Sequence, residues 1–249
     1  MRHVRTRILI AATLACAAMP AFATGDDAWH GSLGMDGWLF VLDGTLTARG
    51  HESNVNTSFK DTADLIGHAN SLFGFNGELG RGRFRVVMDG MHLDFDLPED
   101  RGEFDLTLER FDGVLAYRTE GDASGAEGYF DLLAGVRWFN IKLGFRGDGP
   151  LDLAVKGEQD TVQPVLGFRG DHKATELIHL KYRADFGGFQ RDDNSMQLYG
   201  AMSFQFQNGF YLDSGVRALS LNYEDGAGDT RFSHRVRYIG PQFGGGWRF

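Results

Sequence analysis

Three observations predict that this chain of 249 residues is an all-β protein, a transmembrane antiparallel up-and-down β-barrel of ten strands. The chain begins with a segment typical of an export signal. It then repeats strand-length stretches in which apolar and polar residues alternate, and its last stretch ends on an aromatic residue, Trp247-Arg248-Phe249. Eight strands is the alternative count, which would apply if the segment 103–118 or 162–171 is not a membrane strand.

Residues 1–23 have the three parts of a cleaved signal peptide. Arg2, Arg5 and Arg7 form a positive head, and the apolar run 8–18 is too short to remain as a membrane-spanning helix. Ala21-Phe22-Ala23 places small residues where signal peptidase reads them. We expect cleavage before Thr24, which leaves residues 24–249 as the barrel domain, and an uncleaved anchor is the alternative.

The single cysteine, Cys16, lies inside the predicted signal peptide. A lipoprotein signal acylated at Cys16 is a second alternative, but the preceding Thr13-Leu14-Ala15 matches such a signal poorly. Cleavage after Ala23 would leave a mature chain without cysteine, which therefore forms no disulfide and has no thiolate chemistry.

The charge and hydropathy of the chain exclude two classes of protein. The net charge is −9, and removal of a signal with three Arg and no acid makes it −12, so no basic surface is available for nucleic acid. No apolar run after residue 23 reaches the length of a spanning helix. A barrel remains compatible with this composition, because half of each strand faces the interior and stays polar.

The first five segments with alternating pattern cover 38–49, 70–79, 84–97, 103–118 and 130–138. In the first of them, apolar residues such as Trp38 and Phe40 alternate with polar ones such as Thr45 and Thr47. The alternation changes phase near Gly90, and changes again between Leu108 and Phe111. A β-bulge at each of these places would explain the change.

The other five segments cover 162–171, 178–186, 196–206, 212–218 and 238–249. The second of them alternates most regularly, with Leu180 and Tyr182 on one face and Lys181 and Arg183 on the other. An even strand number puts both chain ends on the periplasmic side, so the connections near 80–83, 119–128, 172–177 and 207–209 are expected there. The connections 50–67, 98–102, 146–160, 191–194 and 225–230 are then expected outside the cell.

A soluble β-sandwich or a secreted lipocalin-like barrel is the structural alternative. The polar faces, however, carry charges of both signs together with glycines, which suits a wet or salt-bridged lumen. Aromatic residues lie near strand ends, where they could form the interfacial girdles of a membrane barrel. These residues are Trp38, Phe40, Trp138, Tyr211, Trp247 and Phe249.

The chain resembles the small outer-membrane β-barrel proteins of proteobacteria, and more narrowly a group of such barrels with a C-terminal aromatic signature. The resemblance rests on the signal peptide, the repeated strands, the terminal Trp247-Arg248-Phe249 and the segments 132–138, 165–170 and 184–189. It implies residence in the outer membrane of a Gram-negative bacterium, in contact with lipid and lipopolysaccharide. It also implies insertion by the barrel-assembly machinery, with Trp247 and Phe249 as the assembly signal, but it brings no established reaction.

Charged residues on the polar faces are the candidates for function. We expect eight of them to line the lumen: Asp131, Arg137, Arg169, Lys181, Arg183, Asp185, Asp213 and Arg217. They could form a salt-bridge network that fills a narrow interior, or they could line a small pore or bind an anionic solute. The expected function is that of a structural barrel or a narrow passive channel with a charged lumen.

Two other functions are alternatives to this expectation. A surface interaction or adhesion protein would act through the outer loops 50–67 and 146–160. A lipid-modifying outer-membrane enzyme would use Ser233 and His234, with Glu224, Asp225 or Asp229 nearby, whereas His30-Gly31-Ser32 is expected to precede the first strand.

We expect no catalytic site, no metal site and no cofactor, and the sequence leaves the oligomeric state open. His51 and Glu52 with Asp61 and Asp64, and His172 with Glu176, lack the spacing of a zinc site.

Overall fold

The computed structural model describes residues 28–48, 51–58, 69–99, 102–147, 154–228 and 231–249. The predicted signal peptide, most of the loop 50–67 and the tip of the loop 146–160 lie outside the described residues. No helix that is long and apolar enough to cross a membrane occurs in the part of the chain that the structure describes.

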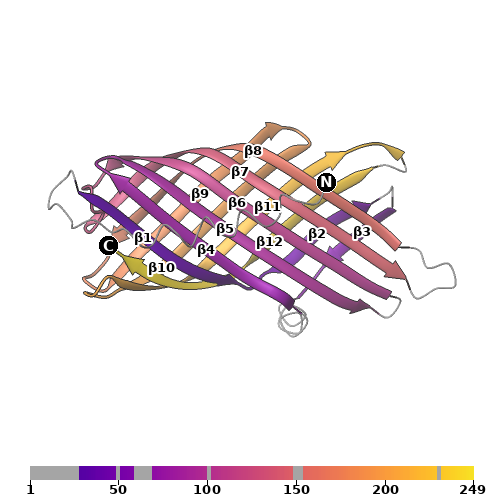
Figure 1. Cartoon of the computed structure of the whole chain (residues 1–249), viewed down its shortest axis with the longest axis horizontal. Coiled ribbons are helices and arrows are strands. Elements are labelled where there is room, and N and C mark those ends of the chain that lie inside the picture. Colours follow the sequence, from indigo (N-terminus) through magenta and orange to yellow (C-terminus); the bar gives the residue numbers. More distant parts are fainter. Residues whose placement is uncertain (1–27, 49–50, 59–68, 100–101, 148–153, 229–230) are drawn as a thin grey trace, which may run out of the picture.

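The described residues form twelve β-strands, which together make one antiparallel sheet (Figure 1). Their bounds are β1 Trp29–Trp38, β2 Val41–Ala48, β3 His51–Asn56, β4 Ala69–Arg81, β5 Phe84–Glu99, β6 Gly102–Glu120, β7 Gly128–Gly147, β8 Ala154–Lys173, β9 Ile178–Gln190, β10 Asp193–Gln205, β11 Phe210–Asp225 and β12 Phe232–Arg248.

Ten of these strands form a closed ring. From β4 to β12 each strand pairs with the next along the chain, and β1 pairs with both β4 and β12. The predicted fold, a closed up-and-down barrel of ten strands, is therefore confirmed, and the alternative of eight strands is wrong. Where β1 pairs with both β4 and β12 the sheet has no free edge, as hydrocarbon requires of a sheet that spans it, whereas β3 pairs with β2 alone among the described strands.

The first strand begins at Trp29, nine residues before the predicted start at residue 38. The register of β1 against β12 (Trp38 opposite Gln242) continues without shift into β2 (Val41 opposite Ile239). Residues 39–40 interrupt the ladder where Pro241, which has no N–H to donate, lies on β12, although the Leu39 N–H donates to the Pro241 carbonyl over 3.0 Å. The extra strand β3, which was not predicted, pairs with β2.

The two predicted β-bulges are wrong. The pairing of β5 runs through Gly90 without a shift, and that of β6 runs through residues 108–111. Apolar side chains instead change from the outer to the inner face of the wall. Val86 and Met88 are exposed, whereas Met91 and Leu93 are buried in the interior.

The two ends of the barrel differ in their connections. Gly31 near the start of β1 is hydrogen-bonded to Phe249, so β1 begins at the end of the barrel that is marked C in Figure 1. We call this end the terminal end and the opposite one the far end. At the terminal end β4 and β5 join through a tight turn, in which Gly82 takes a φ of 58°, a left-handed conformation that glycine adopts readily. The connections after β6, β8 and β10 also lie at this end and are short.

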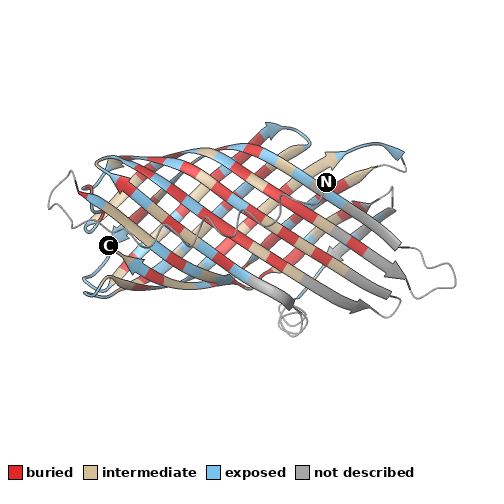
Figure 2. Ribbon diagram, viewed as in Figure 1, coloured by how far each residue is buried: buried red, intermediate tan, exposed pale blue. Residues whose placement is uncertain are grey.

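The outer face of the wall is apolar. Buried and exposed residues alternate along the strands in Figure 2, and the exposed ones include Leu33, Met35, Leu132, Val216 and Phe243, each 50% exposed or more. Such a surface would be unfavourable in water and is suited to the hydrocarbon of a membrane. The barrel is therefore of the transmembrane type.

Three of the six aromatics predicted for the girdles lie inside instead. Trp38 and Phe40 pack with Tyr238 in the interior, at ring-centroid distances of 5.0 to 6.2 Å, and Tyr211 is buried. Trp247 is exposed on the outer surface, Phe249 is 37% exposed at the end of the barrel, and Trp138 is half-buried.

Candidate functional site

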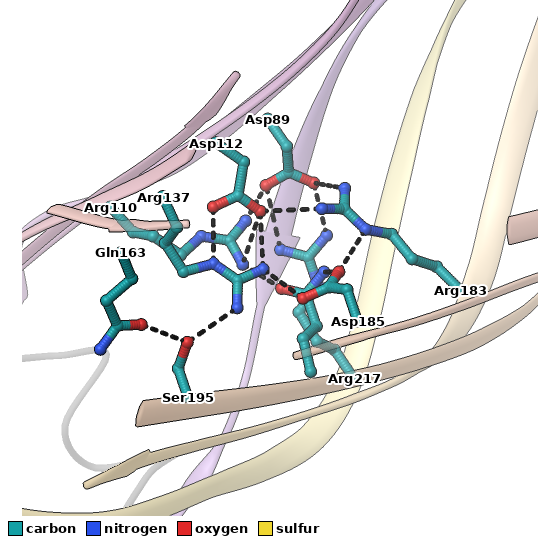
Figure 3. Close-up of polar contacts among 10 residues, drawn as sticks. Asp89, Arg110, Asp112, Arg137, Gln163, Arg183, Asp185, Ser195 and Arg217 are labelled. Atoms are coloured by element: carbon teal, nitrogen blue, oxygen red, sulfur yellow. Dashed lines mark hydrogen bonds and ion pairs between the residues drawn. The ribbon is translucent and has the colours of Figure 1, made fainter. Parts of the chain in front are cut away.

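A layer of paired charges crosses the interior of the barrel (Figure 3). It contains four arginines and three aspartates, which come from β5, β6, β7, β9 and β11 and which we call the charged layer: Asp89, Arg110, Asp112, Arg137, Arg183, Asp185 and Arg217. All seven are at least nine-tenths buried. Strand alternation turns these side chains inward, away from the apolar outer face.

Arg137 lies at the centre of the charged layer and is fully buried. Its Nε and Nη2 donate to the two carboxylate oxygens of Asp112 over 2.7 and 2.8 Å, and Nη2 also donates to Asp185 over 2.6 Å. Its Nη1 donates to the Ser195 hydroxyl over 3.2 Å, and this hydroxyl donates to Gln163 over 2.6 Å. The two-point contact fits the planar guanidinium to the carboxylate.

Arg183 on β9 donates hydrogen bonds to the same two carboxylates. Its Nε donates to Asp185 over 2.6 Å and its Nη2 donates to Asp112 over 2.9 Å. Asp112 and Asp185 therefore each receive hydrogen bonds from two arginines, which offsets part of the cost of removing the carboxylates from water.

Asp89 holds the remaining two arginines and joins opposite walls of the barrel. Arg217 on β11 donates to Asp89 on β5 over 2.9 Å, and Arg110 donates to both Asp89 and the Gln197 amide oxygen. The four guanidinium groups exceed the three carboxylates by one positive charge. Neutral acceptors, Gln197 and Ser195, supply the additional hydrogen-bond partners.

An apolar layer lies on the far side of the charged layer. It combines Trp38, Phe40, Leu42, Leu46, Met91, Leu93, Leu106, Leu108, Phe139, Ile141, Leu219, Leu221, Val236 and Tyr238, all of them buried. Inward-facing positions recur every two residues along a strand. On β5, β6, β7 and β11 the first residue of the apolar layer therefore lies two residues beyond the last residue of the charged layer. The apolar layer explains why the outward apolar pattern changes phase near Gly90.

A cavity of about 650 Å³ lies on the other side of the charged layer and opens at the terminal end. Its lining runs from His30, Lys173 and Phe249 at the mouth to Asp89, Arg183 and Arg217 of the charged layer. The interior thus consists of a cavity, a charged layer and an apolar layer in sequence.

Ion pairs also line the wall of the cavity. Asp131, which is fully buried, accepts hydrogen bonds from Arg118 over 2.9 Å and from Arg169 over 2.8 Å. The ammonium of Lys181 lies 2.8 and 2.9 Å from the two oxygens of Asp213 and 4.3 Å from the centroid of the Tyr211 ring. The eight residues expected to line the lumen therefore lie in the interior: four belong to the charged layer, Arg169, Lys181 and Asp213 line the cavity, and Asp131 is buried beneath Arg118 and Arg169.

The turn 121–127 folds over the mouth of the cavity. Carbonyls of Asp122 and Ala123 accept hydrogen bonds from the interior arginines Arg118 and Arg85, and Ala123 is buried. Burial in the turn acts to raise the pKa of Asp122. Hydrogen bonds from the Ser124 hydroxyl, over 2.8 Å, and the Gly125 N–H, over 2.6 Å, outweigh this effect and hold that pKa below its usual range.

The two Ser–His pairs do not form a hydrogen-bonded catalytic arrangement in the described structure. His30 and Ser32 lie on β1 and not before the first strand, and no hydrogen bond joins them in the described structure. Ser233 and His234 are adjacent on β12, so their side chains point to opposite faces of the wall. His234 is buried and its Nε2 lies 2.9 Å from the Tyr238 hydroxyl.

The residues that could have bound a metal ion do not come together at one site in the described part of the chain. Among the described residues no group of three or more His, Cys, Asp or Glu side chains could hold a metal ion. Glu176 pairs with Lys173 over 3.0 Å, while Asp61 and Asp64 fall outside the described residues.

The last strand is anchored up to its final residue. The N–H of Gly31 donates to the Phe249 carbonyl over 2.8 Å, and the Phe249 N–H donates to the Gly31 carbonyl over 2.9 Å. Trp247 packs on Phe210 with 5.0 Å between the ring centroids.

Several interior residues were missed from the sequence, above all Asp89, Arg110 and Asp112. They stand at the alternate positions that also hold Arg85 on β5 and Arg118 on β6, so the alternation alone could have found them. The two predicted bulges concealed this signal, because a bulge in the middle of each strand would exchange the inward-facing and outward-facing positions beyond it.

No family model matches the chain, and no curated protein matches it. Among solved structures, the chain is similar to the attachment invasion locus protein Ail of Yersinia pestis, with a TM-score of 0.39 and 8% identity over 88% of this chain and 98% of that one. The chain is also similar to the translocator domain of the autotransporter NalP from Neisseria meningitidis, with a TM-score of 0.43 and 11% identity over 97% of this chain and 93% of that one. A third similar structure is the outer membrane protein OprG from Pseudomonas aeruginosa, with a TM-score of 0.33 and 9% identity over 89% of this chain and 94% of that one. Likeness at this level carries no conclusion about function.

Proposed function

We propose that this protein is an integral outer-membrane barrel of structural type, whose lumen is closed to the passage of solutes. The observation that carries the proposal is the order of the interior: the cavity ends at the charged layer, and the apolar layer follows it. The alternative of a narrow passive channel would require a hydrated path through both layers.

Each layer opposes ions for its own physical reason. In the charged layer a permeating ion would have to separate Arg137 from Asp112 or Arg217 from Asp89, and unpaired charges in a dry interior cost several kcal/mol. In the apolar layer water itself is unfavourable, as it is at the hydrophobic constrictions that close channels by dewetting.

The apolar surface and the sequences at the two chain ends support an outer-membrane location. The apolar outer face needs a membrane, and a barrel is the form in which strands cross one. The proposed signal peptide 1–23 would take the chain across the inner membrane, after which Trp247 and Phe249 would serve the barrel-assembly machinery. The terminal end, with its short turns, would then face the periplasm, and lipid with lipopolysaccharide would surround the wall.

We also propose that the protein is not an enzyme. The separation of Ser233 and His234 onto two faces supports this, as does the hydrogen bond of His234 to Tyr238. No observation on the described residues favours adhesion through the loops 50–67 and 146–160.

Single-channel recording in a planar bilayer tests the closed lumen. The refolded barrel should carry no steady current, while its heat-modifiable gel migration confirms that it is folded. A variant that removes groups from both layers, Arg137→Ala/Arg217→Ala with Leu108→Ser, serves as the positive control and should conduct. Steady conductance by the wild-type barrel would overturn the proposal in favour of a small porin.

A further inference from the structure

One carboxylate in the cavity lacks a cation. Six acidic residues line the cavity, and five of them, Glu78, Asp89, Glu127, Glu176 and Asp213, form an ion pair with an Arg or Lys. The sixth is Asp36 on β1. Among the described residues its carboxylate has one hydrogen-bond partner, the Asn76 amide at 3.1 Å.

The two positions directly opposite Asp36 carry no side chain that could cover its carboxylate. Its partners across the two adjacent strands are glycines, Gly74 on β4 and Gly244 on β12. A Cβ atom at Gly244 would lie only 2.9 Å from the Asp36 Cβ, so a larger residue there would crowd the carboxylate. Asp36 therefore lies in an open section of the cavity wall.

The next charge along this row of the sheet is again a carboxylate. Asp213 on β11 also faces Gly244, so Asp36 and Asp213 flank one glycine, with roughly 10 Å between their Cα atoms. Asp213 already holds the Lys181 ammonium, against the ring of Tyr211. The wall thus contains one occupied ammonium site beside an unoccupied carboxylate.

A second acceptor without a partner lies next to Asp36. Gln242 is 5% exposed, lines the cavity, and has no hydrogen bond to its Oε1. It faces Trp38, two residues from Asp36 on β1, which makes it the diagonal neighbour of Asp36 across the β1–β12 pair. A buried amide oxygen without a donor is uncommon in a folded protein and needs an explanation.

We propose that the cavity binds a small organic ammonium compound, a primary amine or diamine, through the carboxylate of Asp36 and the Oε1 of Gln242. An ammonium group has three N–H donors and no acceptor, which matches one carboxylate and one amide oxygen. The cavity of about 650 Å³ also has room for the carbon chain, which a bare metal ion would leave empty.

Calorimetric titration of the refolded full barrel with 1,4-diaminobutane tests the proposal, and 1,4-butanediol serves as the uncharged analogue. We expect the wild type to bind the diamine and not the diol. Asp36→Asn keeps the shape of the side chain and should weaken diamine binding at least tenfold. The matched control Asp192→Asn changes an exposed carboxylate in the β9–β10 turn and should bind like the wild type.

The proposal is overturned if the diol binds as well as the diamine, if neither binds, or if Asp36→Asn binds the diamine like the wild type. Gel migration shows whether each variant is folded. Should Asp36→Asn fail to fold, Gln242→Met replaces it and should weaken binding at least threefold, with unchanged binding counting against the site. Binding is read independently of conductance, so a conducting barrel that binds the diamine would refute the closed lumen and leave this inference intact.

Discussion

Removal of the Arg137 side chain is the sharpest test of the charged layer. In Arg137→Ala the variant loses four hydrogen bonds, two to Asp112 and one each to Asp185 and Ser195. Both carboxylates stay buried, and a buried charge that loses its partner typically costs about 3–5 kcal/mol. Arg183 still contacts Asp112 and Asp185, so we expect a loss near the lower limit, about 3 kcal/mol in the free energy of unfolding.

The assay is urea unfolding of the refolded barrel, followed by tryptophan fluorescence and by the folded band on an unheated gel. Arg235→Ala is the control, because it breaks an ion pair with Glu224 on a side chain that is 49% exposed. Pairs of this kind contribute at most about 1 kcal/mol, after screening by water and salt. If Arg137→Ala is no less stable than Arg235→Ala, the charged layer is hydrated and does not close the lumen.

Three further predictions concern the terminal strand, the apolar layer and the turn 121–127. Deletion of Phe249 removes the pairing with Gly31 and should reduce insertion into the outer membrane while export continues, which fractionation would show; normal outer-membrane levels would contradict the assembly signal. Leu108→Ala should lower the free energy of unfolding by about 2–5 kcal/mol, because the side chain is fully buried, whereas an equal effect of the exposed Leu132→Ala would argue against a packed layer. The pKa of Asp122 is lowered by its hydrogen bonds, so its contribution to the turn is complete above the usual value of about 4 and is lost as the pH falls through the lowered value. As the pH falls through this lowered pKa, the hydrogen exchange of the Gly125 amide should accelerate relative to its intrinsic rate. If Asp122→Ala shows the same acceleration with falling pH, the carboxylate is not responsible.

The period of the sequence was sufficient to predict the ring of strands. Alternation with period two has a single physical origin in a membrane barrel, because one face meets lipid and the other the lumen. Nine of the ten predicted segments therefore coincide with strands β4 to β12. The first strand was placed too late because Gly31, Gly34 and Gly37 dilute its pattern, although Leu33 and Met35 still mark the outer face.

The reversal of the apolar pattern was misread for a definite reason. Periodicity shows that apolar residues change faces, but it does not show whether the backbone shifts or the environment changes. In β5 the environment changes: beyond Gly90 the inner face packs in the apolar layer, while the pairing with β4 and β6 stays in register. A one-residue shift of the wall would have turned Arg85 or Leu93 toward lipid, so the uninterrupted register is the arrangement that keeps both inside.

The partners of the charges could not be predicted from one sequence. Arg110 on β6 contacts Gln197 on β10, and Arg217 on β11 contacts Asp89 on β5, so each contact depends on the width of the ring and the stagger of its strands. Alternation gives the face on which a charge lies and nothing about the opposite wall. Asp36 has the same limitation, since its lack of a cation becomes visible only when the surrounding walls are in place.

The position of each charge along the barrel explains why the carboxylate of Asp36 can remain without a cationic partner. Asp112 and Asp185 are buried in the charged layer, where little water reaches them, and each is held by two arginines. Asp36 faces the open cavity, where water or a dissolved cation can solvate the carboxylate and the cost of leaving it unpaired is small. Asp36 faces glycines on both adjacent strands, Gly74 and Gly244, and a Cβ at either position would lie less than 3.0 Å from Asp36, so both positions hold the residue that leaves the carboxylate open. That contrast within one interior is the reason to test Asp36 with a cation before any other residue of the barrel.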